Sequence, residues 1–215
     1  MLRSILLRHL AALCLLAGVA GAHADELTSA IADLQQRWAV ANYELRAAPR
    51  VAALERLTQD AQALTQRYPE RAEPWVWSGI IRSTLAGARG GLGALGIAKA
   101  ARRDLEQAMT IDPAALDGSA YTSLGTLYFK VPGWPVGFGD KDKAERLLRR
   151  ALELNPNGID ANYFYGEFLY EQGRKAGAVR YLERARAAAP RPGRELADHG
   201  RQQEIAALLA KAGAE

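Results

Sequence analysis

The stretch Ala144-Glu-Arg-Leu-Leu-Arg-Arg-Ala-Leu-Glu-Leu-Asn-Pro156 decides the fold of this chain, because its pattern of small and apolar residues occurs three times. Each copy has alanine first, leucine four residues later, alanine three residues after the leucine, and proline five residues after that alanine. The other two copies begin at Ala101 and Ala178. Alanine lets two helices approach closely, and proline cannot continue a helix. The pattern therefore predicts three equivalent helices, each followed by a proline.

A glycine precedes each copy, at Gly79, Gly125 and Gly166. Around Gly125, the residues Tyr121, Leu124 and Tyr128 form an apolar stripe with a spacing of three and four residues. A similar helical pattern surrounds the other two glycines. Each repeat is therefore predicted to be a pair of antiparallel helices, with the glycine of the first helix facing the alanines of the second.

The three copies resemble the tetratricopeptide repeat family over about residues 72–190, because that family also has small residues at the helix crossings and a terminal proline. The resemblance implies stacked helix pairs whose first helices line a concave groove. No alternation of apolar and polar residues persists long enough to predict a strand. We therefore expect an all-α, tetratricopeptide-type helical-repeat solenoid.

Two copies are longer than the third. From glycine to first alanine there are 12 residues in the last copy, 19 in the middle copy and 22 in the first. The extra residues predict two long loops inside the repeats, at residues 85–96 and 131–140. Insertions in solenoids often gather on one face, and this is often the binding face.

These two segments, together with Trp75-Val-Trp77 and the aromatic stretch of residues 162–170, resemble a periplasmic tetratricopeptide family. That family is the T component associated with TRAP-type solute transporters. The resemblance implies an accessory scaffold that binds a protein partner, such as a solute-binding subunit, or a small solute.

Residues 1–24 have the features of a cleaved secretory signal peptide, with Arg3 and Arg8 before an apolar run and Ala22-His23-Ala24 as the cleavage site. An uncleaved anchor and a lipoprotein modified at Cys14 are the alternatives. Cleavage would remove two arginines and no acidic residue, so the formal net charge would fall from +4 to +2. A nearly neutral, exported chain does not favour nucleic-acid binding. We therefore expect a periplasmic protein.

The rest of the chain is predicted to have three parts. Residues 25–70 form a degenerate leading helical pair, and residues 71–190 form the three repeats. Residues 191–215 contain a capping helix from Leu196 to Lys211 and a tail, because the exposed face of a last repeat needs a cover.

Candidate binding residues follow from the spacing after each glycine and from the two insertions. Ser83, Thr84 and Glu171 lie on the same faces of the predicted first helices. Of the residues on these faces, only Lys130 is typical of a site that binds the C-terminal carboxylate of a peptide. The candidates are Val76, Ile80, Thr122, Thr126, Phe129, Lys130, Tyr163, Glu167 and Tyr170 from the helices, and Arg89, Trp134 and Phe138 from the insertions.

Several of these positions have two interpretations. Trp134 and Phe138 either form a recognition lip or fold back onto the core. Glu167 and Glu171 share a helix face, so they are either solvated or paired with a cation, such as a bound amine or a hard metal. The glycines of residues 91–96 have the spacing of a dinucleotide loop but lack the preceding strand, so a connection between helices is favoured. Exposed amides there, with Arg89, could alternatively hold an anion.

An enzyme is not expected. After cleavage the chain would have one histidine, His199, and no cysteine, which excludes thiol nucleophiles and thiolate metal sites. No cofactor or metal site is predicted. The sequence favours a non-enzymatic scaffold for a protein partner or small solute; the alternative is an envelope-assembly adaptor or a self-assembling repeat protein, which would be a homo-oligomer.

Overall fold

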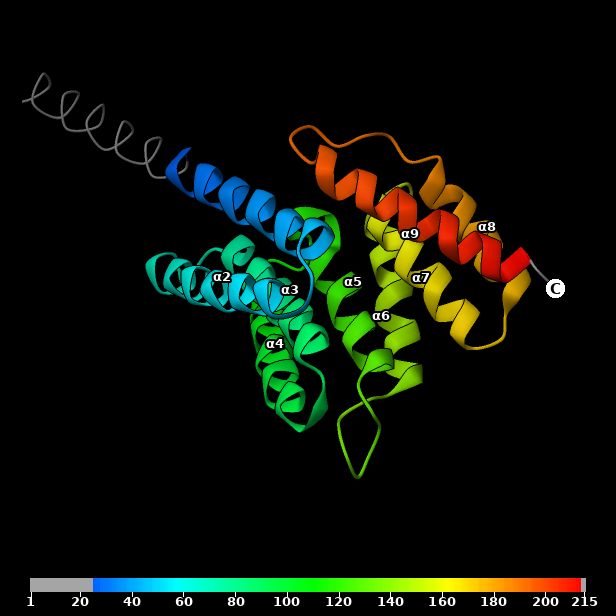
Figure 1. Cartoon of the computed structure of the whole chain (residues 1–215), viewed down its shortest axis with the longest axis horizontal. Helices are drawn as coiled ribbons and strands as arrows, with labels where there is room; N and C mark the ends of the chain where they lie inside the picture. The colour runs from blue at the N-terminus through cyan, green and yellow to red at the C-terminus, as the bar shows by residue number, and fades with distance from the viewer. Residues whose placement is uncertain (1–24, 214–215) are drawn as a thin grey trace, which may run out of the picture.

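The computed structural model describes residues 25–213 (Figure 1). The predicted signal peptide, residues 1–24, lies outside the described residues, so its cleavage stays a prediction. A helix over residues 25–39 leads into a π-helical turn. The elements that follow are η1 (Val40–Glu44), α2 (Ala47–Arg67), α3 (Ala72–Arg89), α4 (Gly91–Ile111), α5 (Ala115–Lys130), α6 (Lys141–Leu154), α7 (Ile159–Glu171), α8 (Lys175–Arg186) and α9 (Glu195–Gly213).

The helices pair as the repeat predicts: α3 packs on α4, α5 on α6, and α7 on α8. The described residues contain no named strand, only one isolated bridge between Gly133 and Gly139. The prediction of an all-α solenoid of helix pairs is confirmed. None of the helices within residues 25–213 has the length and hydropathy of a membrane span.

The three glycines occupy equivalent crossings. A Cβ at Gly79 would lie 2.5 Å from Leu105 Cγ. The corresponding distances are 2.8 Å from Gly125 to Leu148 Cγ and 2.9 Å from Gly166 to Leu182 Cγ. The facing alanines and leucines are all 0% exposed: Ala101, Leu105, Ala108, Ala144, Leu148, Ala151, Ala178, Leu182 and Ala185. Glycine is therefore required at these positions because a leucine of the second helix fills the space of a side chain.

The prediction of a loop at residues 85–96 is wrong. Residues 85–96 are helical except for the turn at Gly90, which connects α3 directly to α4. Gly90 and Gly91 have φ of 61° and 63°, a left-handed conformation that glycine adopts without steric cost. The ten extra residues therefore lengthen both helices instead of forming a loop. As a result α4 has 21 residues whereas α8 has 12.

The second predicted loop is present. Between α5 and α6 the chain forms a narrow projection, closed by a hydrogen bond from Gly139 N to Pro132 O of 2.9 Å. It projects beyond the helices at the bottom of Figure 1. Asp140 directly precedes α6, and its carboxylate accepts a hydrogen bond from Lys143 N at 2.9 Å. Asp140 is therefore the N-cap of α6.

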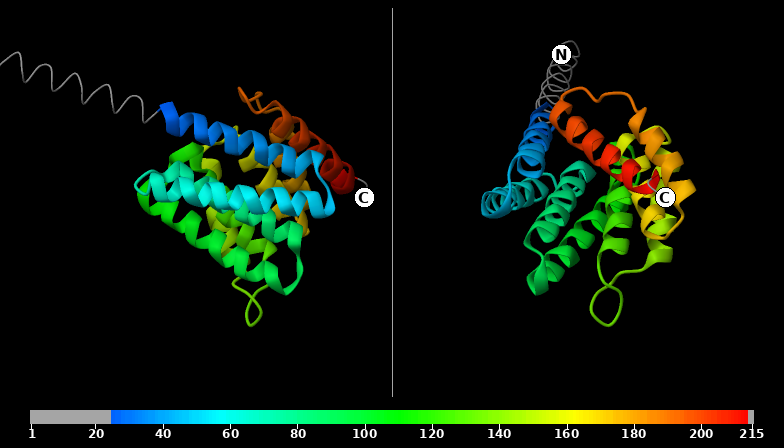
Figure 2. Two further views of the ribbon diagram at one scale, coloured as in Figure 1. Left: turned by 60° about the vertical axis from the view of Figure 1, so that its left-hand side comes forward. Right: turned by 45° about the vertical axis from the view of Figure 1, so that its right-hand side comes forward.

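The last helix does more than cover α8. Besides α8 and α7, α9 packs on η1 from the other end of the chain. Gly200 of α9 is buried against Tyr43 of η1. Figure 2 shows the orange-red C-terminal segment reaching across to the blue N-terminal helix. The two ends of the solenoid therefore meet on its concave side.

Two apolar clusters stabilise this arrangement. One runs through the repeats from α3 to α9 and includes Leu105, Leu148 and Leu182. The other joins the helix over residues 25–39 and α2 to α3, and it includes Trp38 and Trp77. Ala197 of α9 belongs to this second cluster, which fixes the beginning of α9 against the N-terminal helices.

Candidate binding pocket

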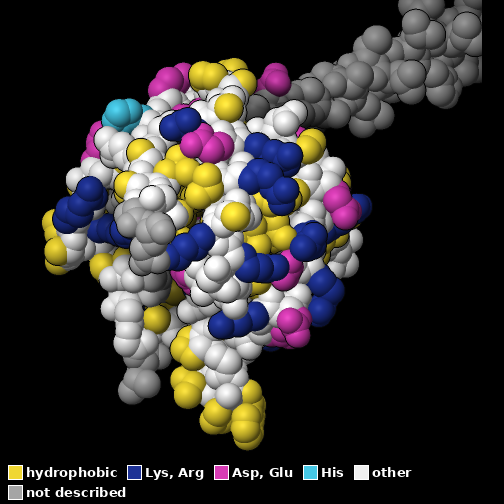
Figure 3. All heavy atoms as spheres, turned by 90° about the vertical axis from the view of Figure 1, so that its right-hand side faces the viewer, with side chains coloured by type: hydrophobic (Ala, Val, Ile, Leu, Met, Phe, Trp, Pro, Cys, Tyr) yellow, Lys and Arg dark blue, Asp and Glu magenta, His cyan; other side chains and the backbone are white. Residues whose placement is uncertain are grey.

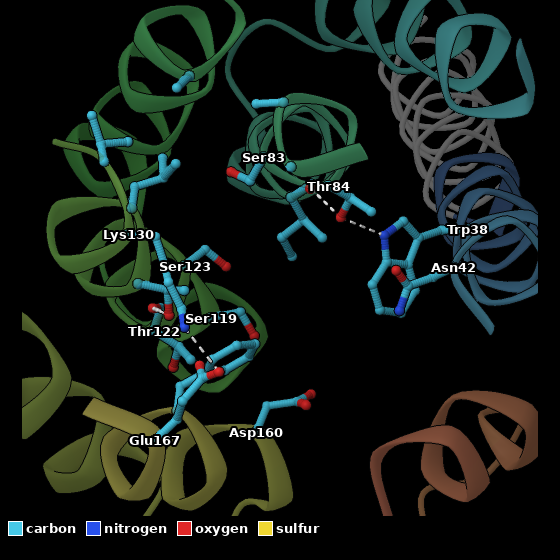
Figure 4. A pocket seen from close by; sticks show the side chains of 18 of the residues that line it. Trp38, Asn42, Ser83, Thr84, Ser119, Thr122, Ser123, Lys130, Asp160 and Glu167 are labelled. Carbon is cyan, nitrogen blue, oxygen red and sulfur yellow. Dashed lines mark hydrogen bonds and ion pairs between the residues drawn. The ribbon is translucent and has the colours of Figure 1, made fainter. Parts of the chain in front are cut away.

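The concave side contains a pocket of about 680 Å³. The first helices of the repeats, α3, α5 and α7, contribute side chains to it, as the tetratricopeptide pattern predicts. The N-terminal helices and residues 191–204 also contribute, and so do α4, with Ala94, Leu95 and Ala98, and the α5–α6 loop, with Val131, Pro132 and Val136. Figure 4 shows Trp38 and Asn42 facing Lys130 and Ser123 across this space. Contact between the chain ends therefore converts an open groove into a pocket.

One side of the pocket is apolar and rich in hydroxyl groups. Trp38 and Trp77 line it, with ring centroids 5.8 Å apart in an edge-to-face arrangement. Trp38 Nε1 donates a hydrogen bond of 2.9 Å to Thr84 Oγ1 (Figure 4), and this fixes the indole. Ile80 and Leu127 add aliphatic surface. This side offers apolar area with a few fixed polar groups, the usual character of a small-molecule site.

Another part of the pocket lining is ionic. Asp160 of α7 accepts a hydrogen bond of 2.8 Å from Arg201 Nε and one of 2.7 Å from an Nη of Arg191. Burial raises the pKa of Asp160, but Arg201 and Arg191 together lower it to about 2. Arg201 is 7% exposed and also pairs with Glu204. Asp160 is therefore a charged link between α7 and the C-terminal segment.

Aromatic rings support the buried guanidinium of Arg201. Its Cζ lies 4.4 Å from the centroid of the Tyr163 ring and 4.5 Å from that of Phe164. Burial is the main cause of a raised pKa of the Tyr163 hydroxyl, with a further contribution from Glu167. Burial also raises the pKa of Glu204, against the lowering effect of Arg201. The cation thus has both carboxylates and π faces around it.

Lys130 is the cation that pairs with Glu167 and Glu171. Its ammonium lies 3.0 Å from Glu167 Oε1 and also pairs with Glu171. Burial alone would lower the pKa of Lys130, but the two carboxylates raise it. The cation that offsets the two acidic residues is therefore a lysine of α5, and the pair gives no support for a bound amine or metal. Residues 25–213 contain no group of three or more His, Cys, Asp or Glu arranged to hold a metal ion.

Half of the predicted site residues line the pocket. They are Ile80, Thr122, Thr126, Lys130, Tyr163 and Glu167, and the associated Ser83 and Thr84 line it too. Val76 does not: it is 0% exposed within the core, because the α3 face at this level packs on neighbouring helices. Its predicted position in the groove is wrong.

Phe129 and Tyr170 also lie outside the pocket. Both are partly buried against the repeat core, and the Phe129 ring centroid lies 5.5 Å from that of Phe168. Arg89 forms an ion pair with Glu55 of α2. Residues 91–96 are the first turns of α4 and not an open loop, and Arg89 is paired with Glu55, so Arg89 is not free to hold an anion there as predicted.

The two aromatic residues of the α5–α6 loop differ in burial. Phe138 folds back, with its ring centroid 5.5 Å from that of Tyr128 and 4.8 Å from Arg102 Cζ. Trp134 is 90% exposed and Val136 is 63% exposed. An apolar tip is visible at the lower edge of Figure 3. The core-packing interpretation holds for Phe138, and only Trp134 is available as part of a lip.

Sequence reasoning missed the residues that the chain ends contribute. These are Trp38, Asn42 and Arg50 on the N-terminal side, and Arg191, Arg194, Arg201 and Glu204 on the C-terminal side. Asp160, at the start of α7, was missed as well. The repeat spacing points only to the first helices of the repeats. A signal was present in the arginines of Pro190-Arg-Pro-Gly-Arg194 and in Arg201 of the predicted capping helix.

Comparison with known proteins agrees with this architecture. A model of the tetratricopeptide repeat matches residues 136–192. Among solved structures, TTC0263, a thermophilic TPR protein of Thermus thermophilus, is similar with a TM-score of 0.59 and 18% identity, over 77% of this chain and 76% of that chain. MamA is 18% identical over 87% of this chain and 91% of that chain, with a TM-score of 0.45. No curated protein matches the sequence.

The family match and the shared fold support the helix pairing described above. At 18% identity the similarity to TTC0263 concerns the fold. The matched segment begins in the α5–α6 loop and ends just after α8, so it includes the third repeat with its Gly166 crossing. The described chain is thus an all-α solenoid of the tetratricopeptide repeat type.

Proposed function

We propose that this protein is a non-enzymatic periplasmic scaffold that holds a small solute in its pocket and presents the 131–140 loop to a protein partner. Tetratricopeptide scaffolds generally act in protein–protein interaction, which supports the partner role. The observation that carries the solute role is the closure of the groove by Gly200 and Tyr43, which leaves a pocket of about 680 Å³. This volume is within the range of about 300–1,000 Å³ typical of small-molecule sites.

The resemblance to the TRAP-associated T component gives the proposal its biological setting. The partner in that setting is the solute-binding subunit of a TRAP-type transporter. Trp134 is the anchor that we assign to the partner contact, because a large exposed aromatic at a loop tip contributes strongly when a partner buries it.

Two measurements test these roles separately. Native mass spectrometry of protein purified from the periplasm is expected to show a retained small-molecule mass. A periplasmic pull-down is expected to capture a transporter solute-binding subunit with the wild type and to lose it with Trp134→Ala. Unchanged capture by Trp134→Ala contradicts the partner contact, and the absence of any retained mass in native preparations contradicts the solute role.

The second candidate is an envelope-assembly adaptor or a self-assembling scaffold. The exposure of both Trp134 and Val136 favours it, because a second copy could also cover this tip. Light scattering coupled to size-exclusion chromatography distinguishes the two. A multimer that Trp134→Ala dissolves, without retained solute, would support self-assembly.

A further inference from the structure

The cations that line the pocket fall into two groups. Lys130, Arg191 and Arg201 each form ion pairs with carboxylates of the chain. Arg50 and Arg194 line the same pocket, and neither has a carboxylate partner within residues 25–213. The pocket therefore contains two guanidinium groups that form no direct ion pair with an acidic residue of the described chain.

The carboxylates near Arg194 are already used. Asp160 accepts hydrogen bonds from Arg191 and Arg201, and Asp198 accepts one of 2.8 Å from Arg191 Nε. Arg194 instead stacks over Trp77, with its Cζ 5.1 Å from the ring centroid. Its Nε is buried and has no hydrogen-bond acceptor within the described residues. Burial and the neighbouring Arg191 lower the pKa of Arg194 by more than Asp160 and Asp198 raise it. An unpaired, partly desolvated cation is costly, and an anion beside it would reduce that cost.

Two further donors of the pocket are unsatisfied. Trp77 Nε1 and Arg50 Nε are buried without an acceptor, although another nitrogen of Arg50 donates to Asn42 Oδ1 at 2.6 Å. With Arg194 Nε, three of the six unsatisfied buried polar atoms in the described chain belong to residues that line this pocket, and all three are donors. Because these three atoms are themselves closed to solvent, a ligand in the pocket would act through the remaining guanidinium nitrogens of Arg50 and Arg194 and through its negative charge.

The apolar surface of the pocket determines what the rest of such a ligand would be. Trp38, Trp77 and Ile80 present apolar surface, and Thr84 already accepts the indole hydrogen bond of Trp38. A purely inorganic anion would leave this surface without a partner. A ligand with both a charged group and an apolar body satisfies the two sides together.

We propose that the pocket binds a small organic anion with an apolar body, with Arg194 contacting the charged group, Arg50 adding positive charge, and the Trp38–Trp77 pair contacting the apolar part. This inference rests on the proposed solute-binding function and specifies the chemistry of the solute. It assigns to Arg194 and Arg50 a role that the repeat pattern does not give them.

Isothermal titration calorimetry of the protein tests the inference. The three ligands have alkyl chains of the same length and differ in charge: octanoate, 1-octanol and octylammonium. Inorganic phosphate and octyl sulfate are added to separate a requirement for an apolar body from a preference for carboxylate. The variants are Arg194→Gln and Arg50→Gln. The control is Arg146→Gln, because Arg146 is a residue of α6 that does not line the pocket. Circular dichroism verifies the folding of each variant.

Octanoate is expected to bind more tightly than octanol and octylammonium. Arg194→Gln is expected to weaken octanoate binding about tenfold or more, as the loss of a charge-assisted hydrogen bond does, with octanol binding unchanged. Arg50→Gln is expected to weaken it in the same direction, and it provides the answer if Arg194→Gln does not fold. Phosphate alone is expected not to compete. Tighter octyl sulfate binding would support an anion site with a sulfate preference.

Three results would overturn the inference. They are equal binding of octanol and octanoate, an octanoate affinity that neither arginine variant changes, and no binding of either anion. If native mass spectrometry then shows a retained neutral or cationic solute, the solute-binding function stands and only the anion chemistry fails. If it shows no retained mass, both fail.

Discussion

Gly200 of α9 lies against the ring of Tyr43 in η1, so closely that a Cβ at residue 200 would come within 2.2 Å of Tyr43 Cδ1. This contact joins the last helix of the chain to the first helical segment. The Tyr43 ring is also 5.9 Å from Trp38, centroid to centroid, which continues the contact to the pocket wall. The shape of the pocket therefore depends on the absence of a side chain at residue 200.

Gly200→Ala is expected to lower the free energy of unfolding by about 1–3 kcal/mol, because an aromatic ring within a packed cluster cannot yield without strain. Gly87→Ala is the control. Gly87 is also helical, but nothing lies within 4 Å of a Cβ there. That substitution is expected to be neutral or to stabilise by up to about 1 kcal/mol. Urea denaturation measures both, and equal effects of the two substitutions would contradict the tight Gly200–Tyr43 contact.

The helix crossing in the third repeat predicts that substitutions at Gly166 and Leu182 are energetically coupled. Gly166 lies opposite Leu182, which is 0% exposed. Leu182→Ala is expected to destabilise by about 2–5 kcal/mol because it leaves a cavity. Gly166→Ala is also expected to destabilise, because its methyl group would overlap Leu182. In the double variant part of the cavity is filled, so the loss should be smaller than the sum of the two single losses. Additive losses would show that the two positions are not in contact.

Local periodicity explains why so much of the fold could be predicted from the sequence. The spacing of Gly125, Ala144 and Leu148 places a glycine against an alanine–leucine face, and this requires no knowledge of distant contacts. The same reasoning located Lys130 and Glu167 on the first helices. It failed for residues 85–96, where the excess of glycine favours a turn but alanine and leucine at helical spacing continue both helices.

The pocket residues that could not be predicted from the sequence are positioned by long-range packing. Arg194 and Arg201 follow the last repeat, and Trp38 lies before the first, so no repeat pattern places them together. Their meeting follows from the orientation of α9, which packs on α7, α8 and η1. Trp134 and Phe138 are a local example of the same limit. Both are aromatic residues in one loop, and only the positions of Tyr128 and Arg102 decide which one is buried.

The link between Asp160 and the C-terminal segment predicts a dependence of stability on pH. The pKa of Asp160 is lowered from 3.8 to about 2 in the folded chain. Its stabilising effect is therefore present above about pH 4 and is lost as the pH falls toward 2. Asp160→Asn is expected to be less stable than the wild type at pH 7, because Arg191 and Arg201 lose their shared carboxylate. The difference should shrink between pH 4 and pH 2.

Urea denaturation of both proteins at pH 7, 4 and 2.5 measures this difference. Asp142→Asn is the control, because Asp142 is an exposed residue of α6 outside the pocket. Glu145, whose pKa is also about 2 through its hydrogen bonds with Arg174 and Arg149, titrates in both proteins and cancels in the comparison. A difference between the wild type and Asp160→Asn that is constant over this pH range would contradict the charged link.

The α5–α6 loop allows stability and partner binding to be separated. Trp134 is 90% exposed, so Trp134→Ala is expected to change the free energy of unfolding by no more than about 0.5 kcal/mol. Phe138 packs on Tyr128 and Arg102, so Phe138→Ala is expected to destabilise by roughly 1–3 kcal/mol. Thermal and urea unfolding of the two variants measure these effects. If Trp134→Ala were as destabilising as Phe138→Ala, the Trp134 ring would have to pack on its own chain, and it could not be the free anchor for a partner.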